Sequence, residues 1–384
     1  MNTQTNFICP ICGNKDSKYI GYINNKPYCR KCITFSGRKA NDFKLSNNNI
    51  SLKLDYKLSK IQEKVARQVL NSFIQKENVL IYAVTGAGKT ELVYYTIDYA
   101  LKHNKSVGFA IPRKDVVIDL YPRFKQSFPN ANVITVYGDH SSIINGDIIL
   151  LTTHQLYRYK NFFDLLIVDE IDAFPYKGNQ VLQNFMLDSV KGNYILMSAT
   201  PSKKDIKEFS KKGKVYTIFE RYHHHPLIVP EIKTASISPI ILLLITINKI
   251  LKENKPLFIF SPTIKIQDEI YPYIKVLFKS GRLVNSQSPD REEIIQDFKN
   301  GKYKYLLTTS ILERGVTCKN LQVIIYNAEH VLYTKETLIQ IAGRVGRKKD
   351  APDGKVYYIC KKISKDMKES IQEIERLNYE AKHM

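Results

Sequence analysis

Ile81-Tyr-Ala-Val-Thr-Gly-Ala-Gly-Lys-Thr-Glu91 is the stretch that decides the fold of this chain. It begins as an apolar strand, breaks into a loop with two glycines and ends in Lys-Thr where a helix is expected to start. A triphosphate needs this arrangement, because backbone N–H groups can wrap the phosphates, a lysine can neutralise the β and γ oxygens and a hydroxyl can ligate Mg²⁺. The sequence therefore predicts a site for ATP and Mg²⁺ formed by Thr85, Gly86, Ala87, Gly88, Lys89 and Thr90. A glycine turn that merely precedes Lys-Thr is the alternative for this stretch alone.

A second decisive stretch is Leu165-Leu-Ile-Val-Asp-Glu-Ile-Asp172, an apolar strand that ends in paired carboxylates. We expect Asp169 to hold Mg²⁺ through water and Glu170 to orient and deprotonate the attacking water. Strands that end in acidic turn residues are common, so this stretch alone is only moderate evidence for a metal site. The phosphate loop about 80 residues earlier makes that interpretation stronger. Ser198 and Thr200 follow a further strand, and their hydroxyls are predicted to couple the carboxylates to movement between domains.

The chain alternates strands and helices in the manner of parallel, doubly wound sheets. In the first half, the expected strands are 106–111, 132–137, 147–152, 165–168 and 194–197, preceded by a helix over 59–74 with Ser59 as N-cap. A second parallel sheet is expected from about residue 237, with strands 257–260, 282–284, 305–309 and 322–326 and a short strand at 357–360. Gln62 at the start of the first helix can reach an adenine edge or remain a solvated helix residue.

Four of the six cysteines lie in the first 32 residues, as Cys9-Pro-Ile-Cys12 and Cys29-Arg-Lys-Cys32. Each pair presents two thiolates from one tight turn, so that together they can close a tetrahedral site for Zn²⁺. Two disulfides are the alternative, which a cytoplasmic chain with a phosphate loop disfavours. Basic and aromatic residues around the knuckles suit contact with a phosphate backbone and exposed bases, or a partner-binding surface.

Length and charge limit the function classes. With 384 residues the chain can hold two or three domains, and a net charge of +21 favours a polyanionic partner such as nucleic acid or a membrane surface. Part of that excess can be a solvated lysine-rich surface. The longest apolar run, 239–248, is far shorter than the ~20 residues that cross a bilayer. We therefore expect a cytoplasmic protein, with membrane contact, if any, peripheral at the inner face of the membrane.

Six stretches stand in the order of the motifs I to VI of superfamily 2 helicases: 83–90, 169–172, 198–200, 260–263, 308–317 and 340–347. Ala83 in place of the first loop glycine is typical of such motors. Within that superfamily the chain resembles the ComFA family of late competence proteins, on the N-terminal knuckles, Asp169-Glu-Ile-Asp-Ala-Phe-Pro-Tyr176 and Glu313-Arg-Gly-Val-Thr317. The resemblance implies an ATP-driven translocase or helicase on single-stranded DNA that helps to import transforming DNA with partners such as ComFC. The related PriA helicases carry their cysteines inside the second motor domain instead.

The resemblance implies an α/β fold with two RecA-like parallel-sheet domains in tandem, preceded by a small zinc-binding module with four cysteines. We expect the module at 1–45, a linker at 46–58, the ATP-binding domain at 59–225 and a second domain at 226–384. On a helix, Arg344 and Arg347 would share one face and reach the γ-phosphate as arginine fingers; a basic helix face bound to DNA or to nothing is the alternative. Gln340 and Gly315 are expected beside the same nucleotide.

Single-stranded DNA is expected to lie across both domains, held by Pro112, Arg113, Thr152, Thr153, Ser261 and Thr309. A basic interdomain loop is favoured over a metal site for His223-His-His225, because neighbouring side chains point in different directions. Three other functions stay open: a replication-restart, repair or RNA motor, a nucleic-acid-binding scaffold with a decayed ATPase, and the motor subunit of a nuclease. An oligomer, including a ring, is compatible with fingers supplied in trans.

Overall fold

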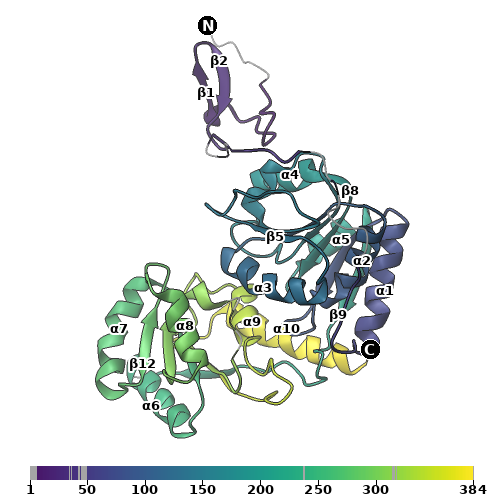
Figure 1. Ribbon diagram of the computed structural model, residues 1–384. Coiled ribbons are helices and arrows are strands. Elements are labelled where there is room, and N and C mark those ends of the chain that lie inside the picture. Colours follow the sequence, from purple (N-terminus) through teal and green to yellow (C-terminus); the bar gives the residue numbers. More distant parts are fainter. Residues whose placement is uncertain are drawn as a thin grey trace. The chain divides into compact units, whose positions relative to one another are not determined.

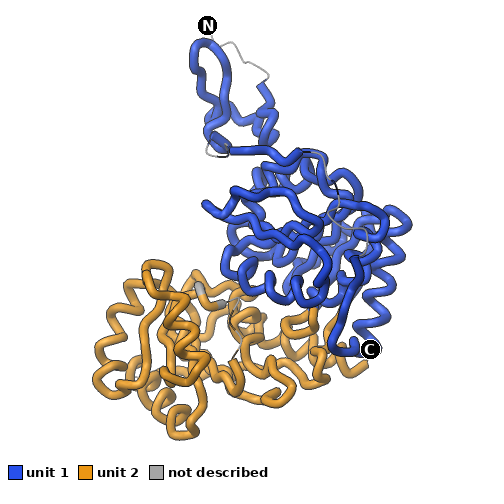
Figure 2. The backbone as a smooth tube through the Cα atoms, viewed as in Figure 1, with its two compact units in different colours: residues 1–83, 89–217 blue, residues 84–88, 218–384 orange. Residues whose placement is uncertain are grey.

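The computed structural model describes residues 7–33, 35, 37–41, 44, 50–236, 238–313, 316 and 318–383. The chain forms two compact units (Figure 2). The first comprises residues 1–83 and 89–217, and the second comprises residues 84–88 and 218–384. Five residues of the phosphate loop thus belong to the second unit rather than to the first. The predicted domain limits, including the linker at 46–58, remain predictions.

The first unit is built on a seven-stranded sheet in the order β5-β6-β4-β7-β8-β3-β9. Its strands are β3 Asn78–Ala83, β4 Val107–Ile111, β5 Val133–Val136, β6 Ile148–Thr152, β7 Phe163–Val168, β8 Val190–Ser198 and β9 Gly213–Ile218. Its helices are α1 Lys60–Ile74, α2 Tyr94–Lys102, α3 Lys114–Ser127, α4 Gln180–Ser189 and α5 Lys203–Phe209 (Figure 1). All residues of β4 and β6 are buried, as expected of parallel strands with both faces covered. The five strands predicted here are confirmed, although β8 begins at Val190 rather than at Tyr194.

The second unit holds a six-stranded sheet in the order β10-β15-β14-β11-β13-β12. Its strands are β10 Glu231–Thr234, β11 Leu257–Phe260, β12 Gly281–Val284, β13 Tyr305–Thr308, β14 Gln322–Tyr326 and β15 Val356–Cys360, and all of its neighbouring pairs are parallel. Its helices are α6 Pro239–Lys252, α7 Ile264–Leu277, α8 Arg291–Lys299, α9 Lys335–Ala342 and α10 Lys365–Lys382. The two predicted parallel-sheet domains are therefore confirmed.

Helix α6 contains the longest apolar run of the chain, residues 239–248. Leu243, Ile247 and Ile250 are buried in one cluster with strand residues of the sheet, whereas Ile241 and Ile245 face solvent. No helix in the described part of the chain is both long and apolar enough to span a membrane.

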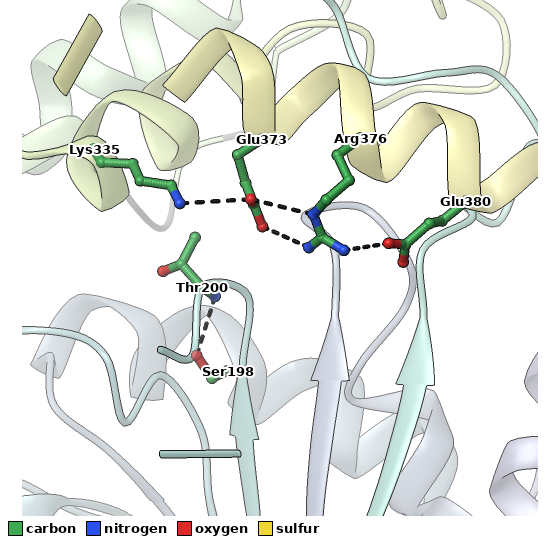
Figure 3. A network of polar contacts seen from close by, with 6 residues as sticks. All are labelled: Ser198, Thr200, Lys335, Glu373, Arg376 and Glu380. Carbon is green, nitrogen blue, oxygen red and sulfur yellow. Dashed lines mark hydrogen bonds and ion pairs between the residues drawn. The ribbon is translucent and has the colours of Figure 1, made fainter. Parts of the chain in front are cut away.

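Helices α9 and α10 pack against each other and share a chain of charged contacts (Figure 3). Lys335 Nζ lies 3.5 Å from Glu373 Oε2, and Arg376 contacts both Glu373 and Glu380. These side chains are partly exposed, so each pair stabilises the unit only by about 1 kcal/mol or less. The network holds α10 beside the helix that precedes Arg344.

The cysteine-rich segment forms a small hairpin of β1 Ile20–Ile23 and β2 Lys26–Cys29 (Figure 1). Its two-residue turn, Asn24-Asn25, has positive φ angles of 49° and 61°, which asparagine tolerates better than most residues and which suit a tight antiparallel turn. The turn brings Cys29 back beside Ile20.

Helix α1 begins where the sequence predicts, at Lys60 after Ser59. The Ser59 hydroxyl accepts a hydrogen bond from the Gln62 N–H, and the Gln62 side chain accepts one from the Ser59 N–H at 2.9 Å. This reciprocal pair satisfies two N–H groups that the helix start would otherwise leave unpaired.

We expect Ser59→Ala to lower the free energy of unfolding by about 1 kcal/mol, because the first turn of α1 loses its cap. Urea denaturation followed by circular dichroism measures the change. Ser51→Ala, at an exposed position outside helices and strands, is the matched control and should unfold like the parent. Equal midpoints for both variants would contradict the capping role.

Candidate active site and metal cluster

The phosphate loop follows β3 and turns through two glycines. Gly86 has φ +84° and Gly88 has φ +76°, a conformation that residues with a Cβ rarely adopt. Ala87 N–H donates to the Val84 carbonyl at 3.1 Å and closes the turn, and Thr90 is followed directly by the helical residues that lead into α2. Both glycines are therefore required by the backbone path, as a phosphate-wrapping loop demands.

Asp169 lies just after β7 and is only 8% exposed. Its Oδ1 accepts the Glu170 N–H at 2.7 Å, and its own N–H donates to the Ala110 carbonyl at 2.9 Å. Burial raises the pKa of Asp169 to about 6, and the nearby positive charge of Lys89 opposes that rise. The structure thus brings Lys89 and Asp169 within electrostatic reach, as the motifs require.

Asp172 joins the acidic stretch to the end of β8. Its two carboxylate oxygens accept hydrogen bonds from the Ser198 hydroxyl at 2.9 Å and the Thr200 hydroxyl at 2.7 Å. The Thr200 N–H also donates to Ser198 Oγ at 3.1 Å (Figure 3). The two hydroxyls predicted to couple the carboxylates to domain movement are thus bonded to the acidic stretch itself.

Gln62 is 5% exposed, which excludes the solvated alternative. Its side-chain oxygen caps α1, so a role at an adenine edge stays a prediction.

Arg344 and Arg347 do not lie on a helix, and that part of the prediction is wrong. Helix α9 ends at Ala342, and Gly346 with φ +67° belongs to the turn that follows. Arg344 is buried and donates to the Val316 carbonyl at 3.0 Å, whereas Arg347 Nε donates to the Gly343 carbonyl at 2.8 Å. Their finger role stays a prediction.

Gln340 is buried in α9, and Gly315 lies outside the described residues.

The four N-terminal cysteines converge as their spacing predicts. All are buried free thiols whose sulfur atoms lie within 4.8 Å of one another. Cys9 Sγ is 3.3 Å from Cys32 Sγ and Cys12 Sγ is 3.5 Å from Cys29 Sγ, well beyond the ~2.05 Å of a disulfide. The arrangement can hold a metal ion with four sulfur ligands.

Two family models match this chain: "Type III restriction enzyme, res subunit" over residues 55–203 and "Helicase conserved C-terminal domain" over residues 242–349. Competence protein ComFA of Bacillus subtilis (strain 168) is 35% identical over 399 residues, which cover 96% of this chain and 85% of that protein. The chain belongs to the ComFA family. Competence protein ComFA of Streptococcus pneumoniae (strain ATCC BAA-255 / R6) is 34% identical, over 92% of this chain and 86% of that protein.

Solved helicases share the fold of this ComFA-family chain. S. cerevisiae Dbp5 bound to RNA and ADP BeF3 aligns with a TM-score of 0.66 at 18% identity, over 84% of this chain and 88% of that one. RecG bound to a three-way DNA junction aligns with a TM-score of 0.60 at 18% identity, over 86% of this chain and 47% of that one. With both helicase domains and the ComFA relationship, the chain is an ATP-dependent helicase of superfamily 2.

The predicted DNA-binding residues gather at the carboxyl ends of neighbouring strands. Ile111 and Thr152 are register partners, so Pro112 and Thr153 follow adjacent strands, and Arg113 precedes α3. In the second unit, Ser261 N–H donates to the Thr308 carbonyl at 2.8 Å, which places Ser261 beside the residue before Thr309. Thr152, Thr153 and Ser261 are buried, whereas Arg113 and Thr309 are partly exposed. Their contacts with DNA stay predictions.

A segment of the ComFA-family chain that the motifs did not single out runs beside the phosphate loop. Ile218 O accepts the Val84 N–H at 3.0 Å, and Tyr222 N–H donates to the Gly86 carbonyl at 3.2 Å. His223 Nε2 bonds the Gly346 carbonyl at 2.9 Å while its Nδ1 accepts the His225 N–H, which requires the neutral ring. Burial first, and Arg221 next, lower the pKa of His223. In the sequence, the three histidines 223–225 marked this segment as unusual, but no pattern pointed to Arg221, which precedes them.

The cysteine module docks on the first helicase domain through Phe35 and Arg158. The Phe35 ring packs edge-on against Phe185, with centroids 4.9 Å apart, and beside Tyr157 at 5.5 Å. Arg158 is 8% exposed, and its guanidinium donates to the carbonyl of Arg38, to Gln155 Oε1 and to Ser141 Oγ. Arg158 ends the short helix η3 Thr153–Arg158 that follows Thr152, so the module is bonded to the segment predicted to contact DNA.

We expect Arg158→Ala to destabilise this docking by about 2 kcal/mol, because the Arg38 carbonyl of the module loses a charged donor and the buried Gln155 side chain loses its partner. Limited proteolysis should then cleave between the module and the domain at lower protease concentration. Arg67→Ala is the control, since Arg67 is 68% exposed and makes only surface contacts, an ion pair with Glu63 and a position over the Tyr95 ring, away from the module. Equal protection of both variants would show that Arg158 does not hold the module.

Proposed function

We propose that this ComFA-family helicase hydrolyses ATP to move along single-stranded DNA, and that this movement serves the import of transforming DNA. The observation that carries the proposal is the phosphate loop, whose two glycines have left-handed backbones, together with the buried Asp169, which lies within electrostatic reach of Lys89. The import role is supported by the relationship to the competence proteins ComFA of two bacteria.

The chemistry follows from the side chains at this site. Lys89 would neutralise the phosphates, and Thr90 and Asp169 would hold Mg²⁺, which supplies positive charge to the β and γ oxygens. Glu170 would orient and deprotonate the attacking water. Arg344 and Arg347 would stabilise charge on the γ-phosphate when bound ATP favours closure of the two domains.

Asp172 offers a route from this chemistry to the DNA. It lies three residues beyond Asp169 and bonds the hydroxyls of Ser198 and Thr200. A shift of the acidic stretch on hydrolysis would therefore move the end of β8. With DNA held at strand ends in both domains, one cycle of closing and opening would shift the grip along the strand.

Contacts with backbone phosphates would make this grip independent of base sequence and sensitive to salt. The net charge of +21 supports a polyanionic partner. Association with ComFC is an expectation that follows from the family resemblance. Peripheral contact with the membrane and oligomer formation are expectations from the sequence that the family does not supply.

Zinc is the metal that the cysteine cluster suits best. Four thiolates at ~2.3 Å from one ion in a tetrahedron stand about 3.8 Å apart, and two of the sulfur pairs lie close to that distance, at 3.3 and 3.5 Å. All four sulfurs are buried, so an ion there would be closed off from substrate and would serve a structural purpose.

Lys89→Ala should reduce ATP hydrolysis by about 100-fold or more and abolish its stimulation by single-stranded DNA, because no other loop residue can neutralise the phosphates. Phosphate release is measured with and without single-stranded DNA, duplex DNA and RNA over a salt series. Lys102→Ala, on the helix after the loop, is the control. DNA-stimulated hydrolysis by the Lys89 variant would refute the site, and stimulation by RNA alone would refute the substrate.

Elemental analysis should find one Zn²⁺ per chain in the purified protein and none in Cys9→Ala, since three thiolates bind zinc far more weakly than four. Cys318→Ala is the control, because Cys318 lies outside the cluster. A parent protein without zinc, or a Cys9 variant that retains it in full, would refute the zinc site.

A further inference from the structure

Arg221 is a buried cation whose hydrogen-bonding capacity is only partly used. Its side chain is 1% exposed, and Nη1 donates to the Gly346 carbonyl at 2.9 Å. Within the part of the chain that the structure describes, Nε and Nη2 have no hydrogen-bond partner. A buried guanidinium with unpaired donors is costly, so its presence here points to a partner outside the chain.

The surroundings of Arg221 lack a negative charge among the described residues that perturb it. Burial first, and Arg347 next, lower the pKa of Arg221 to about 9, which leaves it charged at neutral pH. Tyr222 is the remaining influence, and the neighbouring His223 ring is neutral by its hydrogen bonds. The guanidinium groups of Arg221 and Arg347 influence each other without a compensating carboxylate, so this place favours the binding of an anion.

Arg221 also lies directly against the phosphate loop. A Cβ placed on Gly86 would be 3.5 Å from Arg221 Cγ and Nε, and the next residue, Tyr222, donates its N–H to the Gly86 carbonyl. Gly86, Arg221 and the turn around Gly346 all belong to the second compact unit. The free donors of Arg221 are therefore held beside the loop whose backbone is shaped for phosphates.

We propose that Arg221 binds a phosphate group of the nucleotide through Nε and Nη2, an inference that rests on the proposed ATP-hydrolysing function. These two nitrogens lie on one edge of the guanidinium, where they can donate two parallel hydrogen bonds to one phosphate. Nη1 would keep its bond to the Gly346 carbonyl. Arg221 would thereby connect bound phosphate to the turn that carries Arg344 and Arg347.

The competing explanation is that Arg221 only holds the Gly346 carbonyl, and the two roles predict opposite effects on stability. Arg221→Gln removes the charge but keeps an N–H donor. If Arg221 serves nucleotide, the variant should melt without nucleotide at the parent's temperature or above, because an uncompensated buried charge is gone. Its Kd for a fluorescent ATPγS should rise by about 10- to 100-fold.

Two further variants separate charge from packing. Arg221→Lys restores the charge and should recover part of the affinity, whereas Tyr222→Phe removes the hydroxyl that bonds the Arg347 carbonyl and should leave the Kd within about threefold of the parent. Arg282→Gln, at an exposed position on β12, is the control for loss of one positive charge.

The outcomes are distinct. An unchanged Kd for Arg221→Gln overturns the inference, whatever its melting temperature. If that variant melts lower, the lysine variant decides: recovered affinity supports phosphate binding, and no recovery overturns it. Equal losses in Arg221→Gln and Tyr222→Phe overturn it as well. A parent protein that binds no ATPγS would overturn the proposed function and this inference together, whereas a parent that binds and an Arg221→Gln variant that binds equally would overturn the inference alone.

Discussion

The parallel register of β3, β4, β7 and β8 is the constraint on which the site in the first unit depends. Tyr82 pairs with Ser198, and Val168 pairs with Leu196 on β8 and with Ala110 on β4. Strands that run in one direction end at one edge, so residues far apart in the chain meet there without any direct sequence signal. A slip by one residue would turn each of these strands over and separate Lys89, Asp169 and Ser198. Burial of all of β4 and of nearly all of β3 and β7 opposes that slip.

This constraint explains which features were predictable. Apolar runs identified the buried strands, and the residues after them were the site residues, so the phosphate loop and the acidic stretch followed from local patterns. Serine at 59, read as an N-cap, marked the start of α1. The prediction that Arg344 and Arg347 lie on a helix failed because the residue pattern Gln-Ile-Ala-Gly-Arg favours continuation of the helix. In the structure, α9 ends at Ala342 and the chain turns at Gly346. Arg221 escaped notice because burial of a charged residue depends on contacts that are distant in sequence.

Function costs stability in this protein at identifiable places. Asp169 and Arg221 are ionisable groups held away from water, one acidic and one basic, and each is costly without a partner of opposite charge. A sequence selected for stability alone would replace both with apolar residues. On the proposed function, bound metal adds to the positive charge of Lys89 beside Asp169, and bound phosphate supplies the negative charge that Arg221 lacks. Nucleotide binding would then be favoured by the relief of that cost.

The cysteine module follows the same logic in a different form. A segment of this size cannot bury enough apolar surface to fold by itself, so a metal and a neighbouring domain are the available sources of stability. The neighbouring domain contributes here: the cysteines belong to the same hydrophobic cluster as Phe163 and Phe185 of the domain, and Phe35 packs against that cluster. The four converging thiols are suited to add a metal. Its anchor, Arg158, ends the short helix that begins after Thr152 at the edge where β6 terminates. On the proposed zinc site, loss of the metal would therefore also weaken the contact at this edge of the sheet, because Arg158 bonds the Arg38 carbonyl from the helix that follows β6.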